Sequence, residues 1–318
     1  MAISKATSDA AGPNAESVFG PARRRIGEKA IAAALFLAAA TSVVITVGIV
    51  ISLTGETLAF FADQAVSVSG FLTGAQWTPL FSDPEFGIRP LVQGTLIITG
   101  IALIVAIPLG IGTAAFLSEY ASPRVRSALK PTLELLAGVP TVVFGYFALT
   151  FFTPSILKGV LGMDVSVFNG LAGGIIVGVL IVPTVASVAE DAMSAVPQSL
   201  REGAYGLGAS RRQVTVRVVG PAALSGITAG IVLGASRAVG ETMVVLIAAG
   251  QVPTTSLDPR NPMETMTAFI GATGKGDVPT GSTGYKAIFA VGFALFLITL
   301  ILNTISIRFV RRYRQVYE

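Results

Sequence analysis

Several uninterrupted apolar stretches, each about as long as a bilayer is thick, constrain the fold of this 318-residue chain most strongly. A helix needs about 20 consecutive apolar residues to cross the hydrocarbon core of a membrane. Only 13% of the residues are charged, roughly half of the share that is usual in soluble domains. The sequence therefore predicts an all-α membrane protein with six transmembrane helices. We expect these spans at about residues 29–53, 91–117, 132–155, 169–189, 222–250 and 285–308.

The Lys and Arg residues alternate between the two sides of the predicted spans. Sixteen of the 22 basic residues lie in segments 1–29, 118–131 and 190–221 and in the C-terminal tail from residue 308 onward. Connections close to the membrane carry an excess of Lys and Arg on the cytoplasmic side. Both termini are therefore predicted to be cytoplasmic, and the basic isoelectric point of about 9.5 reflects topology rather than nucleic-acid binding.

One membrane domain is predicted over residues 29–310, between cytoplasmic tails at 1–28 and 311–318. The first apolar stretch exceeds the 7–15 residues of a signal-peptide core. We expect it to be a retained anchor, although three arginines at 23–25 precede it.

Two longer segments are predicted on the outer side. In the segment between the first two spans, Phe60, Phe61 and Trp77 favour a helix on the outer membrane surface. The segment 251–284 is rich in Pro, Gly and Thr and is interpreted as an irregular loop.

The chain contains no Cys and no His. Disulfides, thiol nucleophiles, Ser-His-Asp catalysis and His-based metal sites are therefore excluded. A membrane-embedded enzyme would need converging carboxylates, and Glu241 is alone at depth. A P-loop match near Lys275 fails because two residues, rather than four, separate its glycines. We expect no catalytic residue, metal or cofactor in this chain.

Glycine and proline mark the interiors of the predicted spans. Glycine recurs at every fourth residue in two spans, at Gly170, Gly174, Gly178, Gly226, Gly230 and Gly234. This spacing places each set on one helix face, where backbones approach closely, so we expect these two helices in the core. Prolines within three spans predict kinks, at Pro108, Pro140 and Pro183.

A spaced motif occupies the predicted cytoplasmic loop 190–221. Glu202 and Ala204 are followed by Gly208 and, after nine further residues, by a Val-Val-Gly-Pro run that ends at Pro221. This pattern resembles the signature of ABC-importer permeases, EAA, three residues, G, nine residues, I-x-L-P. Gly, Val and Gly replace the second Glu-Ala-Ala residue, the Ile and the Leu of that signature.

Residues 197–207 form an amphipathic stretch that predicts a short helix, with Gly208 suited to a left-handed end. The resemblance implies that this is a coupling helix, which docks on an ATPase subunit. Arg201 and Glu202 would then face the ATPase, and Ala204 and Gly208 would allow close approach. The alternative is a solvated basic connector.

Arg237 and Glu241 lie within the fifth predicted span. A charge in the membrane is costly and usually marks a function, and residues four apart on a helix are close enough to pair. One interpretation is an ion pair that only holds helices together. The other is that Arg237, whose planar fork suits oxyanions, binds an anion on its path while Glu241 neutralises it otherwise. Ser236 and Thr242 complete the candidate path.

Two further stretches make the resemblance more specific. The sequences ASRAVGETMVV and TLELLAGVPTVVFGYFAL resemble the fifth and third spans of phosphate-specific (Pst) ABC-importer permeases of the PstC-like type. The resemblance implies the type I importer (MetI-like) fold and phosphate translocation across a prokaryotic inner membrane by alternating access. It also implies a PstA-like permease, a PstB-like ATPase dimer that binds ATP and Mg, and a PstS-like phosphate-binding protein. A permease for another oxyanion or small solute, and a secondary transporter or channel, remain as alternatives.

Overall fold

The computed structural model describes residues 26–63, 66–276 and 278–313. Of the predicted tails 1–28 and 311–318, residues 1–25 and 314–318 lie outside these ranges. Within them the chain is helical, and its β-structure is one isolated bridge between Trp77 and Phe86. The all-α prediction is therefore confirmed.

The chain divides into two compact units, Met1–Ser52 and Leu53–Glu318. The described part of the first unit belongs to helix α1 (Ile26–Phe61), and the last turns of α1 belong to the second unit. The stretch Lys29–Phe61 is long and apolar enough to cross a membrane.

The second unit holds the remaining helices, among which η denotes π-helical stretches. Before the centre of the chain these are α2 (Val68–Thr73), α3 (Arg89–Ala115), η2 (Phe116–Tyr120), α4 (Pro123–Ala137), α5 (Thr141–Phe147) and η3 (Ala148–Val160). They continue with α6 (Gly170–Ser194), α7 (Gln198–Gly206), α8 (Arg211–Val214), η4 (Thr215–Val219) and α9 (Gly220–Ala222). The last four are α10 (Leu224–Val239), α11 (Met243–Ala248), α12 (Met266–Thr273) and α13 (Thr283–Tyr313).

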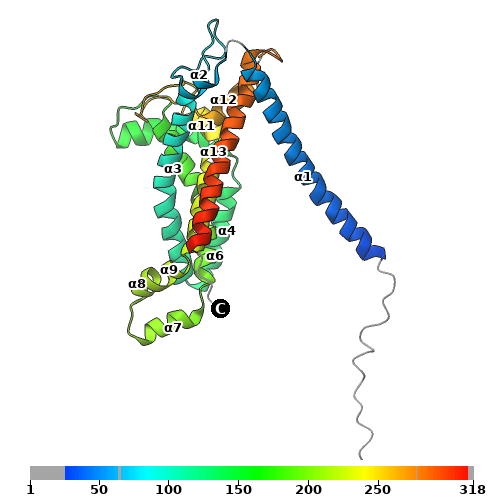
Figure 1. The fold of residues 1–318 in the computed structure, drawn as a ribbon. Coiled ribbons are helices and arrows are strands. Elements are labelled where there is room, and N and C mark those ends of the chain that lie inside the picture. Colours follow the sequence, from blue (N-terminus) through cyan, green and yellow to red (C-terminus); the bar gives the residue numbers. More distant parts are fainter. Residues whose placement is uncertain (1–25, 64–65, 277, 314–318) are drawn as a thin grey trace, which may run out of the picture. The chain divides into compact units, whose positions relative to one another are not determined.

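Helix α6 is the centre of the second unit and packs against both α3 and α10; α3 and α6 run side by side (Figure 1). A Cβ atom added at Gly178 would lie 2.8 Å from the carbonyl oxygen of Ala102 on α3. One added at Gly226 on α10 would lie 2.2 Å from the Cβ of Ala192 on α6. The predicted glycine faces are therefore the surfaces where these core helices meet.

Five helical stretches of the described chain are long and apolar enough to span a membrane on their own. They correspond to five of the six predicted spans, with one shift. The third begins at Thr141 rather than near residue 132, because residues 123–137 form the separate amphipathic helix α4. Pro140 was expected to kink this span, but it lies at the N-cap of α5 and begins the helix instead.

The fifth predicted span is not one continuous helix. Residues 211–222 and 224–239 are long and apolar enough to cross a membrane only when taken together, and the chain bends by 74° between them. Helix α10 ends at Val239, and the short helix α11 begins only at Met243. The expected apolar run is thus broken on both sides of α10.

The two ends of the second unit differ in character. Helices α2 and α12 lie at one end, and α7 and α8 lie at the other (Figure 1). At the first end Phe60, Phe71, Trp77 and Phe86 pack edge to face, with ring centroids 5.2–6.3 Å apart. These rings are buried, and the helix expected in this segment is α2, whose place on the outer membrane surface stays a prediction. The segment 251–284 also contains a helix, α12, where an irregular loop was expected.

Candidate functional site

Arg237 lies in the last turn of α10, against the central helix α6. Its Nη1 donates a hydrogen bond to the Oγ1 of Thr184 on α6 at 3.1 Å. The side chain is half-buried. A guanidinium held by one hydroxyl keeps further N–H groups for an anionic ligand.

Glu241 does not pair with Arg237, and the sequence-based expectation of an ion pair is wrong. Helix α10 has ended at Val239, so the four-residue spacing no longer places the two side chains on one helix face. The Oε1 of Glu241 instead accepts hydrogen bonds from the backbone N–H groups of Thr242, Met243 and Val244 at 3.1–3.2 Å. A carboxylate that accepts these bonds caps the start of α11.

The backbone at Glu241 is held as well. The Oγ1 of Thr267, on α12, donates to the carbonyl oxygen of Glu241 at 2.6 Å. The Oγ1 of Thr242 donates to the carbonyl oxygen of Gly240 at 3.2 Å. Glu241 and Thr242 therefore shape the break between α10 and α11, next to Arg237.

Ser236 lies beside Arg237 and turns toward α13. Its Oγ donates to the Oδ1 of Asn303 at 2.7 Å. Both residues line a cavity of about 550 Å³ together with Ser306 and several apolar side chains. Sequence reasoning missed Asn303, although an amide within an otherwise apolar span was a usable signal.

At the opposite end from α12, helix α7 covers most of the predicted coupling segment. It runs from Gln198 to Gly206, and Gly208 follows with a φ of 80°. The predicted short helix and its left-handed glycine are both confirmed. Glu202 and Gly208 are exposed, and Ala204 is half-buried.

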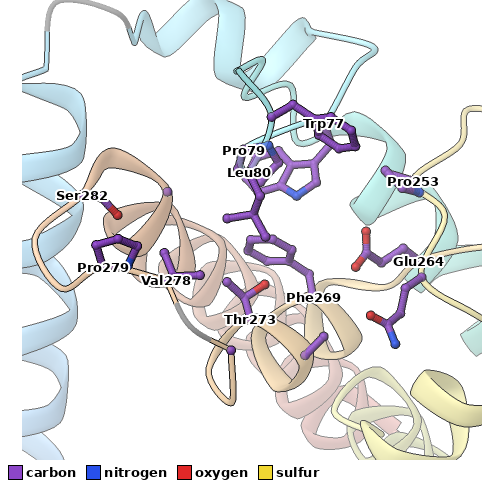
Figure 2. A pocket seen from close by; sticks show the side chains of 15 residues that line it. Trp77, Pro79, Leu80, Pro253, Glu264, Phe269, Thr273, Val278, Pro279 and Ser282 are labelled. Carbon is purple, nitrogen blue, oxygen red and sulfur yellow. The ribbon is translucent and has the colours of Figure 1, made fainter. Parts of the chain in front are cut away.

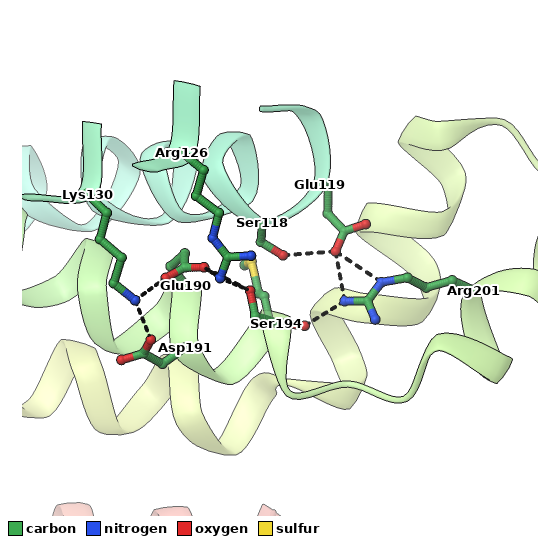
Figure 3. A network of polar contacts seen from close by, with 9 residues as sticks. Ser118, Glu119, Arg126, Lys130, Glu190, Asp191, Ser194 and Arg201 are labelled. Carbon is green, nitrogen blue, oxygen red and sulfur yellow. Dashed lines mark hydrogen bonds and ion pairs between the residues drawn. The ribbon is translucent and has the colours of Figure 1, made fainter. Parts of the chain in front are cut away.

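Arg201 was expected to face the ATPase, but it points inward from α7 instead. Its Nη2 lies 3.0 Å from the Oε1 of Glu119 on η2, and the two side chains are only 11% and 4% exposed. The same nitrogen donates to the carbonyl oxygen of Met193, near the end of α6, at 2.7 Å. Figure 3 shows Arg201 reaching across to Glu119. Arg201 therefore fastens α7 to two elements of the helical core.

A second group of ion pairs lies next to the first and joins α4 to α6 (Figure 3). The fully buried carboxylate of Glu190 pairs with Arg126 and, at 2.7 Å, with Lys130. Lys130 also pairs with Asp191 at 2.6 Å. Hydrogen bonds to the carboxylates of Asp191 and Glu190 raise the pKa of Lys130.

Sequence reasoning missed Glu119 and Glu190. Each carboxylate lies within two residues of the end of a predicted apolar span, which was the available signal. Their partners are far away along the chain, so only the packed structure identifies the pairs. Within the described ranges, no three acidic side chains gather as they would around a metal ion.

The chain is similar to known membrane transport proteins. Residues 106–315 match the family model described as binding-protein-dependent transport system inner membrane component. A probable ABC transporter permease, YqgH of Bacillus subtilis, is 34% identical, with 87% of this chain and 88% of that protein covered. The phosphate transport system permease protein PstC of Mesorhizobium japonicum is 33% identical, with 81% and 84% covered.

A second protein of that description, PstC 1 of Mycobacterium tuberculosis, is 34% identical, with 78% of this chain and 84% of that protein covered. Among solved structures, a bacterial ABC transporter that imports alginate has a TM-score of 0.63 at 17% identity, over 92% of this chain and all of the other. The MetNI methionine ABC transporter has a TM-score of 0.55 at 16% identity, over 70% and 94% of the two chains.

Proposed function

Since this chain belongs to the binding-protein-dependent transport system inner membrane component family, we propose that it is the phosphate-translocating permease subunit of an ATP-binding-cassette importer. The observation that carries the proposal is the similarity to phosphate permeases over about four fifths of the chain. The similarity includes the residues around Arg237, which is the one basic residue in the interior of a predicted span, since Lys29, Lys286 and Arg308 lie at span ends.

Arg237 is the proposed contact for phosphate on its path. A guanidinium donates two parallel hydrogen bonds to phosphate oxygens and stays charged at every physiological pH. The hydrogen bond from Arg237 to Thr184 supports this role, because it orients the guanidinium and leaves its other N–H groups for phosphate. Ser236 and Thr242 are proposed to contribute hydroxyl groups on either side.

Glu241 is proposed to shape the path rather than to neutralise Arg237. Its carboxylate is bound to three backbone N–H groups at the start of α11. These bonds keep its negative charge away from the guanidinium. Arg237 is then free to bind an anion without having to break an ion pair first.

Coupling to ATP hydrolysis is proposed to pass through α7. Glu202 is exposed at the surface of α7 and is proposed to contact an ATPase subunit, while Ala204 and Gly208 permit close approach. Arg201 is proposed to act as a positioning residue, since its pairing with Glu119 ties α7 to the helical core. Motion of the ATPase subunits would then be transmitted to α6 and α10, and so to Arg237.

The family implies an ATPase and a substrate-binding protein as partners and a multi-pass location in the membrane. We propose that the partners are a PstA-like permease, a PstB-like ATPase dimer and a PstS-like phosphate-binding protein. ATP and Mg would be bound by the ATPase dimer. The positive-inside rule further supports cytoplasmic termini, which places α7 in the cytoplasm and α2 and α12 outside.

The test is transport by the assembled complex in proteoliposomes. We expect uptake of radiolabelled phosphate that requires both ATP inside the vesicles and the binding protein outside. A tenfold excess of sulfate or molybdate should leave this uptake nearly unchanged. Equal inhibition by sulfate would reassign the substrate to another oxyanion, and uptake without ATP would contradict the importer class.

A further inference from the structure

A cavity of about 650 Å³ lies at the α2 and α12 end of the second unit. Residues before α3, the loop that leads into α12, and α12 with the segment after it line this cavity. Figure 2 shows Trp77, Glu264 and Phe269 converging on it from these three segments. The volume lies within the range of about 300–1,000 Å³ that is usual for small-molecule sites, and the proposed function does not use it.

The walls are largely aromatic and aliphatic. Trp77 and Phe269 are each only 3% exposed, and their rings pack edge to face with centroids 5.0 Å apart. Leu80 and Phe81 also line the cavity and are exposed to solvent. These walls suit an apolar chain, and the rings offer faces that attract a cation.

Among the described residues that line the cavity, Glu264 is the one with a titratable side chain. The residue is buried, yet its carboxyl group has neither an ion pair nor a hydrogen bond within the described parts of the chain. Such a carboxyl group is costly to ionise until a cation reaches it. Burial accordingly raises the pKa of Glu264 to about 7.

The backbone beside this carboxyl group is held in place by α3. The carbonyl oxygen of Glu264 lies against Gly94, where an added Cβ atom would come within 2.3 Å. The N–H group of Met266 donates to the Oγ1 of Thr95 at 3.1 Å. The acid is thus anchored at the wall of the cavity, while its side chain has no partner among the described residues.

We propose that this cavity binds an alkylammonium group. The methylene chain lies against Trp77 and Phe269, and the ammonium group pairs with the carboxylate of Glu264. An apolar stem that ends in a compact cation is the chemistry of a lysine side chain, and a free primary amine shares it. An anion such as phosphate finds no cationic partner among the lining residues.

Trp77 provides the readout, because it is the single tryptophan of the chain. The full-length protein in lipid nanodiscs is titrated at pH 8 with n-butylammonium and, separately, with 1-butanol, and tryptophan fluorescence is followed. We expect a saturable change with the amine and at least tenfold weaker binding of the alcohol. Equal responses to the two compounds would overturn the proposal, since the cavity would then be selecting apolar bulk alone.

The Glu264→Gln variant should lose the preference for the amine over the alcohol. Glu85→Gln removes an exposed carboxylate from the segment that also carries Trp77, and it should keep the preference. Amine binding to the wild type should also weaken roughly tenfold between pH 8 and pH 6, because a carboxyl group with a pKa near 7 is mostly protonated at pH 6. Unchanged amine binding in Glu264→Gln would contradict the proposal.

Capped lysine, Nα-acetyl-lysine methylamide, distinguishes the two sources of the ammonium group. Binding of both the capped lysine and n-butylammonium assigns the cavity to a lysine side chain of a protein docked on this end. Binding of n-butylammonium alone assigns it to a free amine. Binding of neither compound overturns the proposal.

Discussion

At the scale of single residues, burial of Glu264 makes the stability of the protein depend on pH. Its pKa is raised from 4.5 to about 7, so between these values the folded state holds a proton that the unfolded state releases. Stability therefore falls as the pH rises through this window and stays level above it. The total loss is about 3 kcal/mol, because each pKa unit corresponds to about 1.4 kcal/mol.

Replacing Glu264 by Gln removes this dependence. We expect the melting temperature of Glu264→Gln to rise relative to the wild type by several degrees between pH 5 and pH 8, measured by thermal unfolding in detergent micelles. Glu85→Gln, which alters an exposed carboxylate, should follow the wild type at every pH. If the melting temperatures of the wild type and Glu264→Gln change in parallel with pH, burial does not raise the pKa of Glu264.

The sequence identified Arg237 because one basic residue within an apolar span stands out without any knowledge of packing. The sequence could not predict the partner of Arg237. Residues four apart pair only on a continuous helix, and α10 ends before Glu241. The carboxylate of Glu241 cannot pair with Arg237 because it accepts hydrogen bonds from the N–H groups at the start of α11. Local capping of this kind has no period that a sequence pattern can reveal.

At the scale of helices, the contact of α10 with α6 depends on the absence of a side chain at Gly226. A Cβ atom there would lie 2.2 Å from the Cβ of Ala192. We expect Gly226→Ala to destabilise the protein by about 1–3 kcal/mol through overpacking, measured as a lower melting temperature. At Gly100 on α3 an added Cβ atom meets nothing within 4 Å, so Gly100→Ala serves as the control. A melting temperature for Gly226→Ala that matches this control would contradict close packing of the two helices.

The ion pair of Arg201 and Glu119 is expected to hold α7 in register with the core. Removing one partner of a buried pair costs about 3–5 kcal/mol, so Glu119→Arg should loosen α7. In the reconstituted complex we expect this variant to hydrolyse several times more ATP per phosphate transported.

Exchanging the two charges, Glu119→Arg with Arg201→Glu, should restore part of the coupling. Restoration is partial because Arg201 also donates to the carbonyl oxygen of Met193. Asp258→Asn alters the ion pair with Arg260 in the segment before α12. This control should leave the number of ATP molecules hydrolysed per phosphate transported unchanged. Wild-type ATP consumption per phosphate transported in the Glu119→Arg complex would show that the Arg201–Glu119 pair does not position α7.

Apolar length located the spans well, because the membrane imposes a minimum length on any crossing helix. The errors arose where an element is defined by something other than length. Helix α4 carries basic residues on the predicted cytoplasmic side, where it pairs with Glu190 on α6, and so it separates from the third span. The bend before α10 and the break after it follow from packing and capping, which apolar length does not encode.

At the scale of the whole second unit, opposite ends carry opposite chemistry. The end with α7 and α8 is held by buried ion pairs, and the end with α2 and α12 is held by packed aromatic rings. Helix α6, with 25 residues, runs between them and spans about 37 Å at 1.5 Å per residue. Since Arg237 is bonded to α6 through Thr184, a displacement of α7 would, in the proposed mechanism, reach the proposed phosphate contact through this helix.

The most direct measurement is phosphate uptake by proteoliposomes that contain the assembled complex with Arg237→Gln. The account predicts a loss of ATP-driven uptake of at least about 10-fold, since a charge-assisted hydrogen bond contributes about 1.5–3 kcal/mol, while the four kinds of subunit still co-purify. Arg260→Gln, which changes an exposed arginine of the segment before α12, should transport phosphate at the wild-type rate. Wild-type uptake by an assembled Arg237→Gln complex would contradict the placement of phosphate at this residue.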